Sequence, residues 1–145
     1  MNRNNKRAEK GDENMELFIA FGTDDGENLT NGHAGDARYF YLYKFSNNEE
    51  EFVEQRRNIE LGAGQSLKPG NPEMAKARAA VFKNLDALVG KEFGPGLPNL
   101  LKQFVCVPVR VATISKAIEV VRNNLDRIRQ EKNKTEDRKH TVVRP

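Results

Sequence analysis

Three short apolar runs constrain the fold of this chain more than any other feature of its sequence. They occupy residues 17–21 (LFIAF), 87–89 (ALV) and 105–111 (VCVPVRV). Such runs are typical of strands in a sheet that helices cover. Helical patterns separate the second run from the third and follow the third, which predicts right-handed parallel crossovers in an α/β domain. Pro108 lacks a backbone N–H, so the third strand is expected at or near a sheet edge.

An aromatic segment is expected to add antiparallel strands to this sheet. Residues 38–45 (RYFYLYKF) have strong strand propensity and are followed by a polar turn at residues 47–51. Residues 52–59 are expected to pair back as the hairpin partner. With the three apolar runs, the hairpin predicts an α/β fold with a mixed five-stranded sheet and helices on its faces. Residues 60–70 are expected to be a glycine-rich loop.

Capping signals predict where the helices begin. Asn71 as the cap, Pro72 at the first helical position and Glu73 near the positive end of the dipole predict one helix start. The apolar face of this helix is expected to consist of Met74, Ala77, Val81 and Leu85. A short helix is predicted within residues 95–104. Thr113 is predicted to cap a long helix with one apolar stripe, made of Ile114, Ala117, Ile118, Val121, Leu125 and Ile128.

Length and charge divide the chain into one domain and two tails. A chain of 145 residues suits one domain with a single core. Residues 1–14 are expected to be a disordered tail, residues 15–126 the folded domain, and residues 127–145 the end of the last helix with a basic C-terminal tail. This last segment has seven lysines and arginines against three acidic residues. Because the acids are interleaved with the cations, a solvated helix end is favoured over a nucleic-acid surface.

Other features exclude whole classes of protein. No apolar run approaches the ~18 residues that a membrane helix needs, and the run at residues 17–21 is too brief for a signal peptide. The single cysteine, Cys106, excludes an internal disulfide framework and an all-cysteine zinc or iron–sulfur site within one chain. Within an apolar strand this thiol is expected to be an inert hydrophobe. A cytoplasmic protein with no membrane contact is expected.

The strand order predicts where a ligand would bind. In open α/β sheets, ligands collect beyond the carboxyl ends of the parallel strands. Glycines at strand-to-helix turns expose backbone N–H groups that attract anions, and Lys91 would add a positive charge while His33 reaches in from above. The loops after the first two apolar runs and the start of the last helix bring the following candidate residues to this edge: Asp24, Asp25, Gly32, His33, Gly35, Gly90, Lys91, Gly94, Gly96 and Thr113.

Each candidate also has a structural interpretation, and the sequence leaves both open. Gly90 and Gly94 would serve to close tight turns in a chain that has no phosphate-loop or dinucleotide motif. A single loop histidine such as His33 is more often a bystander than a ligand. Asp24 and Asp25 would pair for metal or acid–base chemistry, but an Asp-Asp-Gly string after a strand is first of all a turn.

Residues 17–45 also carry a family resemblance. They combine an apolar strand, the string Thr-Asp-Asp-Gly at residues 23–26, the loop Gly-His-Ala-Gly at residues 32–35 and an aromatic strand. This order resembles the dinitrogenase iron–molybdenum cofactor biosynthesis family, which includes the small NifX-like domains and the C-terminal part of NifB. The resemblance continues through the later strands and the Thr113 helix, and covers roughly residues 16–126.

The resemblance implies a fold and a role. It implies a ribonuclease H-like three-layer fold and a nonenzymatic protein that binds or carries an iron–sulfur or iron–molybdenum cofactor precursor, in the context of nitrogen fixation. In the family the histidine of a Gly-His-Phe-Gly motif is the usual candidate cluster ligand, and His33 occupies its place with Ala34 where the aromatic residue stands. Implied partners are metallocluster assembly proteins, the recipient metalloenzyme or a second copy. Independently of the resemblance, the exposed face of the aromatic hairpin is expected to be a self-association edge, as sheet edges often are.

Two alternatives to a carrier are kept. A ribonuclease H-like nuclease needs several carboxylates converging on two metal ions, whereas Asp24 and Asp25 lie beyond their strand and Asp86 is the only acid near the second parallel strand. Nuclease activity is therefore not expected, and nucleic acid is not favoured as a partner. The other alternative is an interaction domain that has kept the fold and lost the cluster site, with weak nucleic-acid binding through its basic tail.

Overall fold

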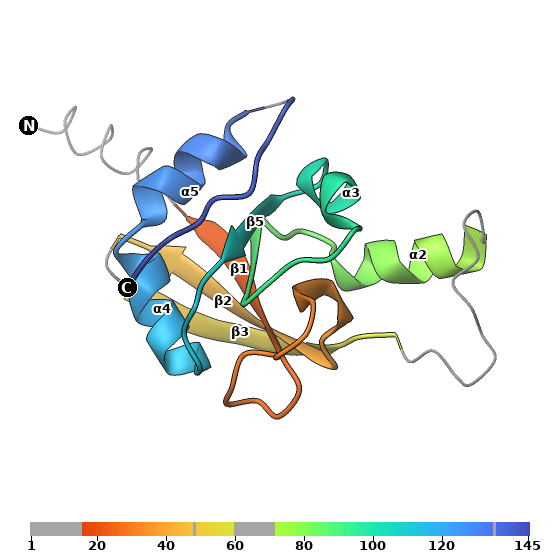
Figure 1. Ribbon diagram of the computed structural model, residues 1–145, viewed down its shortest axis with the longest axis horizontal. Helices are drawn as coiled ribbons and strands as arrows, with labels where there is room; N and C mark the ends of the chain where they lie inside the picture. Colours follow the sequence, from red (N-terminus) through yellow and green to blue (C-terminus); the bar gives the residue numbers. More distant parts are fainter. Residues whose placement is uncertain (1–15, 48, 60–71, 135) are drawn as a thin grey trace, which may run out of the picture.

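A computed structural model describes residues 16–47, 49–59, 72–134 and 136–145 of the chain (Figure 1). The predicted N-terminal tail and the predicted glycine-rich loop at residues 60–70 lie outside these residues. The strands are β1 (Leu17–Thr23), β2 (Tyr39–Ser46), β3 (Glu49–Arg57), β4 (Ala87–Gly90) and β5 (Val105–Pro108). The helices are η1 (Ala34–Asp36), α2 (Pro72–Val81), α3 (Leu97–Leu101), α4 (Ile114–Arg122) and α5 (Leu125–Lys132).

The strands form one mixed sheet in the order β3-β2-β1-β4-β5. β1 is the central strand and pairs in parallel with β4, which pairs in parallel with β5. The hairpin of β2 and β3 adds to the other side of β1 in antiparallel fashion. The predicted five-stranded mixed sheet is confirmed, and β5 lies at its edge as Pro108 indicates. Figure 1 shows α4 and α5 on one side of the sheet and η1 and α3 on the other, giving a three-layer α/β fold.

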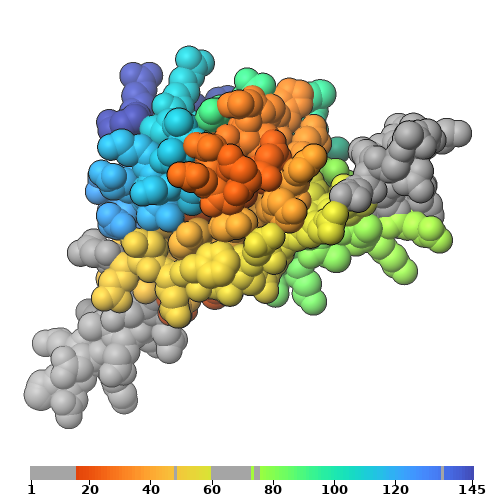
Figure 2. Space-filling view, turned by 90° about the horizontal axis from the view of Figure 1, so that it is seen from below, coloured from red at the N-terminus to blue at the C-terminus, as the bar shows by residue number. Residues whose placement is uncertain are grey.

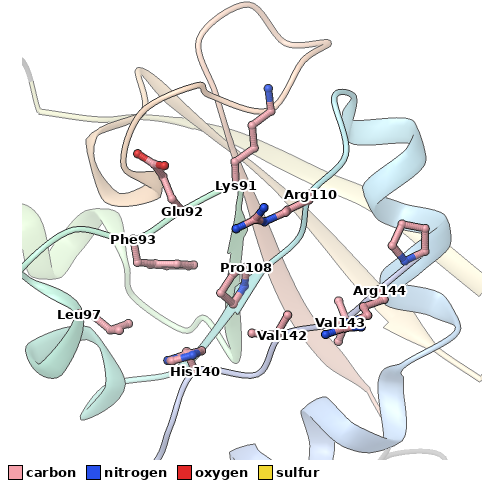
Figure 3. Close-up of a pocket in the computed structure, with 11 residues that line it drawn as sticks. Lys91, Glu92, Phe93, Leu97, Pro108, Arg110, His140, Val142, Val143 and Arg144 are labelled. Atoms are coloured by element: carbon pink, nitrogen blue, oxygen red, sulfur yellow. The ribbon is translucent and has the colours of Figure 1, made fainter.

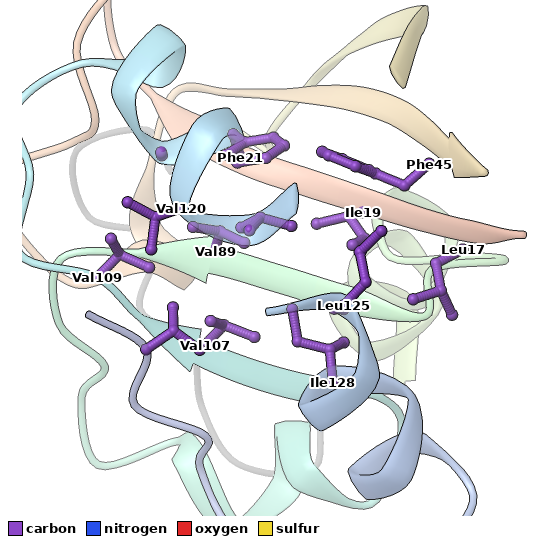
Figure 4. Packing of buried hydrophobic residues seen from close by; sticks show 14 of the residues in the cluster. Leu17, Ile19, Phe21, Phe45, Val89, Val107, Val109, Val120, Leu125 and Ile128 are labelled. Carbon is purple, nitrogen blue, oxygen red and sulfur yellow. The ribbon is translucent and has the colours of Figure 1, made fainter. Parts of the chain in front are cut away.

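Alternate residues of the central strands build two cores. Leu17, Ile19 and Phe21 of β1 point to the face that α4 and α5 cover, where they pack with Val120 and Ile128 (Figure 4). The intervening residues point to the opposite face, which contains Phe40, Phe82 and Phe104 among others. The ring centroid of Phe82 lies 5.2 Å from that of Phe40 and 5.4 Å from that of Phe104. Two-sided burial explains why β1 and β4 are almost continuously apolar.

The hairpin is tighter than the predicted turn at residues 47–51. β3 begins at Glu49, which pairs with Ser46, so the last three residues of the predicted turn are part of the strand. Asn47 has a φ of 53°, a left-handed conformation that asparagine tolerates well. The Nε of Arg122 on α4 donates to Glu50 Oε1 at 2.9 Å. This tertiary contact holds a glutamate in the strand although its intrinsic strand propensity is low.

The predicted long helix after Thr113 is divided in two. Thr113 does cap α4, because its Oγ1 accepts a hydrogen bond from the N–H of Lys116 at 3.1 Å. The helix ends at Arg122, and α5 begins at Leu125. At the break the Asn124 side chain donates to the carbonyl of Val120 at 2.7 Å, and such side-chain bonds compete with the helical backbone.

Two other elements end earlier in the structure than the sequence predicts. α2 ends at Val81, so Leu85 is buried beyond the helix instead of lying on its apolar face. β5 ends at Pro108, whereas the prediction continued to residue 111. Within the described residues, no helix is both long and apolar enough to cross a membrane.

The end of the chain runs along β5 and does not form a solvated helix end. The N–H of Thr141 donates to the carbonyl of Cys106 at 2.9 Å, and that of Val143 to the carbonyl of Pro108 at 3.4 Å. Val143 is 1% exposed and belongs to the core under α4 and α5. The Arg138 guanidinium holds the part of the tail before Thr141 in place, because it donates to the carbonyls of Leu101 and Lys132. The tail therefore covers carbonyl groups that an edge strand would otherwise leave open.

Packing of the tail predicts a stability effect outside the family-like region. Val143→Ala is expected to lower the free energy of unfolding by about 1–2 kcal/mol, because two buried methyl groups are lost. Val142→Ala is the matched control, since Val142 is 43% exposed. It should change stability by less than about 0.5 kcal/mol. Urea unfolding of both variants measures the difference, and equal losses would contradict a packed tail.

Candidate functional site

The three predicted loop segments do meet at the carboxyl ends of the parallel strands. The N–H of Ala34 donates to the carbonyl of Glu92 at 2.8 Å, which joins the loop after β1 to the loop after β4. The N–H of Leu29 donates to the carbonyl of Ala112 at 2.8 Å, and the N–H of Ile114 to that of Glu27 at 2.9 Å. These last two bonds join the β1 loop to the start of α4. The strand topology predicts this convergence, and the structure confirms it.

Two glycines allow η1 to lie directly on the sheet. A Cβ atom added to Gly90 would lie 2.3 Å from the Cβ of Ala34, and one added to Gly22 would lie 3.0 Å from the Ala34 carbonyl oxygen. Ala34 is fully buried by this contact. The residue at this position therefore points into the core, where Ala34 packs against Gly90. Gly90 thus allows close packing against Ala34, a role different from the closing of a tight turn that the sequence analysis considered.

His33 lies on the rim of this packed turn, immediately before η1. Its side chain is 45% exposed and is flanked by two carboxylates: Nδ1 is 3.8 Å from Asp36 Oδ2, and Nε2 is 4.0 Å from Glu92 Oε1. A Cβ atom on Gly94 would lie 2.4 Å from Nδ1, so only glycine leaves room for the imidazole at this place. The His33 ring thus occupies space that Gly94 leaves free, although 61 positions separate the two residues in the chain.

A groove of ≈ 680 Å³ opens beside His33. Three of the predicted glycines, Gly35, Gly94 and Gly96, line it, and Phe93 with residues of α3 supplies apolar surface. Arg78 of α2 adds a cation that the sequence analysis missed. Its Nη2 donates to the Gly35 carbonyl at 3.4 Å, and its guanidinium carbon lies 5.7 Å from the centre of the Phe82 ring. Nothing in the local sequence distinguishes Arg78 from the other cations of the chain.

Three other predicted residues lie away from this groove. Lys91 Nζ donates to Asn31 Oδ1 at 2.6 Å, and the side chain does not line the hollow beside His33. Thr113 is occupied as the cap of α4. A Cβ atom on Gly32 would meet nothing within 4 Å, so this glycine is not required by close contacts. Arg78, and not the predicted Lys91, therefore provides a positive charge at the groove.

Asp24 and Asp25 shape the loop after β1. Asp24 Oδ1 accepts hydrogen bonds from the N–H of Arg38 at 2.9 Å and from Thr30 Oγ1 at 3.2 Å. Asp25 Oδ1 accepts from the N–H groups of Asn28 and Glu27 at 2.7 and 2.9 Å. These bonds agree with the turn interpretation. No group of three histidine, cysteine or acidic side chains close enough to hold a metal ion occurs within the described residues.

The only cysteine of the chain is buried and is not available as a metal ligand. Cys106 is buried in β5, and burial raises the pKa of its thiol to about 12. Because the thiolate is the form that ligates metals and attacks electrophiles, this side chain is inert at neutral pH. His33 therefore provides the only imidazole that lines the groove among the described residues.

The fold and the site together define a small α/β protein with a histidine on an open groove at the carboxyl ends of its parallel strands. The family described as dinitrogenase iron–molybdenum cofactor matches residues 15–126. The chain belongs to this family, which is associated with biosynthesis or binding of that cofactor. No curated protein matches the chain significantly. The matched region contains the groove residues and ends before the tail that lies along β5.

The contact between Gly90 and Ala34 predicts a stability effect. Gly90→Ala is expected to lower the free energy of unfolding by about 1–3 kcal/mol, because the new methyl group overlaps Ala34. Gly96→Ala is the matched control, since a Cβ atom there meets nothing within 4 Å. Adding Ala34→Gly to Gly90→Ala should restore stability relative to the single variant, which thermal unfolding would measure. Equal effects at Gly90 and Gly96 would contradict close packing of η1.

The Asp25 carboxylate predicts a feature of acid titration. Hydrogen bonds from the N–H groups of Asn28 and Glu27 lower its pKa to about 2 from 3.8. Because the folded pKa lies below the unfolded one, its contribution to stability is complete above pH ~4 and is lost as the pH falls towards 2. Carboxyl ¹³C shifts should give a midpoint near 2 in the folded protein and near 3.8 in urea. A common midpoint would show that these bonds do not form in solution.

Proposed function

We propose that this protein is a nonenzymatic carrier that binds an iron–sulfur or iron–molybdenum cofactor precursor as its cargo. The observation that carries the proposal is the placement of His33 on the groove, in a chain that belongs to the dinitrogenase iron–molybdenum cofactor family. One side-chain ligand on an open groove suits reversible holding of a preassembled cluster. Assembly of a cluster from its elements requires more ligands than this groove presents among the described residues.

His33 Nε2 is the atom that we assign to the cargo. Gly94 packs against the Nδ1 side of the ring, whereas Nε2 faces only the exposed carboxylate of Glu92 at 4.0 Å. The Asp36 carboxylate lies on the Nδ1 side of the ring, with Oδ2 at 3.8 Å from Nδ1. A carboxylate on the far nitrogen orients a ligating histidine and raises its basicity.

Charge at the groove supports an anionic cargo held weakly. Arg78 lines the groove as a cation, while Asp36 and Glu92 place negative charge beside His33. An anionic cluster is attracted by Arg78 and repelled by Asp36 and Glu92. Such a balance favours release to the next protein over permanent retention. The partners proposed are accordingly metallocluster assembly proteins and a recipient metalloenzyme.

A second copy of the chain would be another source of ligands. Figure 2 shows β3 along the surface of the molecule, and its Phe52 and Val53 are 49% and 44% exposed. Phe52 forms an aromatic cluster with Tyr41 and Tyr43, at centroid distances of 5.7 and 5.4 Å. This hairpin face supports the predicted homodimer. Sedimentation of cluster-loaded protein tests it, and a loaded monomer would exclude a dimer as the cluster-binding unit.

Anaerobic loading tests the carrier function. Purified protein is incubated with an iron–sulfur cluster or with iron–molybdenum cofactor and desalted, after which metal content and visible absorption are measured. The wild type is expected to retain cluster, and His33→Ala to lose at least about nine tenths of it, because the direct ligand is gone. His140→Ala is the matched control, since His140 is the only other histidine of the chain and does not line the groove.

A second variant separates ligation from folding. Gly94→Ala keeps the histidine but forces the imidazole from its place, so retention should fall with a changed absorption spectrum. If His33→Ala retains as much cluster as the wild type, the proposed ligand is wrong. If the wild type retains none, the alternative is favoured: an interaction domain that has kept the fold without the cluster site.

Contacts of the C-terminal tail argue against the alternative in which the basic tail binds nucleic acid. Lys132 Nζ lies 3.1 Å from Asp86 Oδ1, and Lys134 Nζ lies 3.0 Å from Glu131 Oε1. Arg138 is held by backbone carbonyls. Several cations of the basic tail are therefore committed to contacts within the protein, which leaves fewer for phosphates.

A further inference from the structure

A second hollow of ≈ 660 Å³ lies between the C-terminal tail and the loops after β4 and β5 (Figure 3). Its apolar lining includes Phe93, Leu97, Pro108 and Val142. The tail residues that complete it lie beyond residues 15–126, the part of the chain that matches the family. The chain end that packs along β5 therefore forms one wall of the hollow.

Three of the four charged side chains that line this hollow, those of Lys91, Arg110 and Arg144, are cations. Arg110, His140 and Arg144 line it, and none of the three has a hydrogen bond or ion pair within the described chain. Figure 3 shows the Arg110 guanidinium extending over Pro108 on the side of Phe93, with His140 across the hollow. An unpaired guanidinium over an apolar surface is a strong partner for a carboxylate or phosphate, because its planar N–H groups match the geometry of both.

Neighbouring side chains do not neutralise these cations. Glu92 is the one acidic side chain of the lining, which also includes the last residue, Pro145, and the Glu92 carboxylate lies 4.0 Å from His33 Nε2. Lys91 extends away to Asn31, at 2.6 Å. Both residues line the hollow, but their charged ends are directed to Asn31 and His33, which do not line it, and Arg110 is left without such a partner among the described residues.

We propose that this hollow binds a small organic anion, a carboxylate or phosphate monoester with an apolar body, and that Arg110 holds the oxyanion. The apolar body would lie against Phe93, Leu97 and Val142. The hollow lies beyond the carboxyl ends of β4 and β5, where open α/β sheets bind their ligands, and its volume is in the range of small-molecule sites. This site is separate from the proposed cluster groove, since neither His33 nor Arg78 lines it.

Matched probes test the proposal. Sodium octanoate, octyl phosphate and octan-1-ol share one apolar chain and differ in the headgroup, so they separate charge recognition from apolar contact. Each is titrated into the wild-type protein while the backbone amide signals of Arg110, Val142 and Val143 are followed by NMR. Saturable shifts are expected with at least one of the two anions and not with the alcohol. The tighter anion identifies the preferred headgroup.

Variants locate the binding site. Arg110→Gln is expected to weaken anion binding about tenfold or more, because a charge-assisted hydrogen bond is lost. Arg127→Gln is the matched control: this exposed arginine of α5 does not line the hollow, and it should bind as the wild type does. Val142→Asp places a negative charge in the hollow and should also weaken binding. His33→Ala should bind octanoate normally, so this result is independent of cluster retention.

Three outcomes would overturn the proposal. The first is equal affinity for octanoate, octyl phosphate and octan-1-ol, which would show that charge plays no part. The second is equal binding by Arg110→Gln and Arg127→Gln in proteins with the same thermal stability. The third is the absence of saturable shifts with either anion in the wild-type protein.

Discussion

The contact of η1 with the sheet is the interaction on which the rest of the site depends. Ala34 lies on β4 without a gap because Gly90 has no side chain, and its N–H bonds to the Glu92 carbonyl just beyond that strand. This contact fixes the turn that precedes η1, and with it the position of His33. The groove beside His33 is consequently a product of glycine packing. A side chain at position 90 would overlap Ala34, which directly follows His33 in the chain.

Loop residues 91–94 lie between the two hollows, and their side chains extend in different directions. Lys91 and Glu92 extend to Asn31 and His33, while Phe93 lines both hollows and Gly94 leaves room for the imidazole. One short segment after a single strand thereby separates the proposed cluster groove from the proposed anion site. Both hollows lie near this segment because β4 and β5 are parallel, so that their carboxyl ends lie at one edge of the sheet.

The C-terminal tail has a structural role that its composition conceals. Its cations suggest a solvated segment, yet Thr141 and Val143 are buried and bond to β5. The edge strand β5 has carbonyls with no partner strand on its outer side, and the tail N–H groups satisfy two of them. The tail therefore protects the sheet edge and at the same time forms one wall of the second hollow.

The sequence by itself determined the sheet, the Thr113 cap and the meeting of three loops, because these depend on local apolar patterns, on proline and glycine chemistry, and on general rules of strand connection. Only the tertiary structure decided that Gly94 faces His33, that Arg78 and not Lys91 reaches the groove, that Asn124 divides the last helix, and that Val143 is buried. Each of these depends on which atoms of distant segments come into contact. Residue patterns record the periodicity of an element, but the direction of an individual side chain at the end of a strand is set by the neighbours it meets.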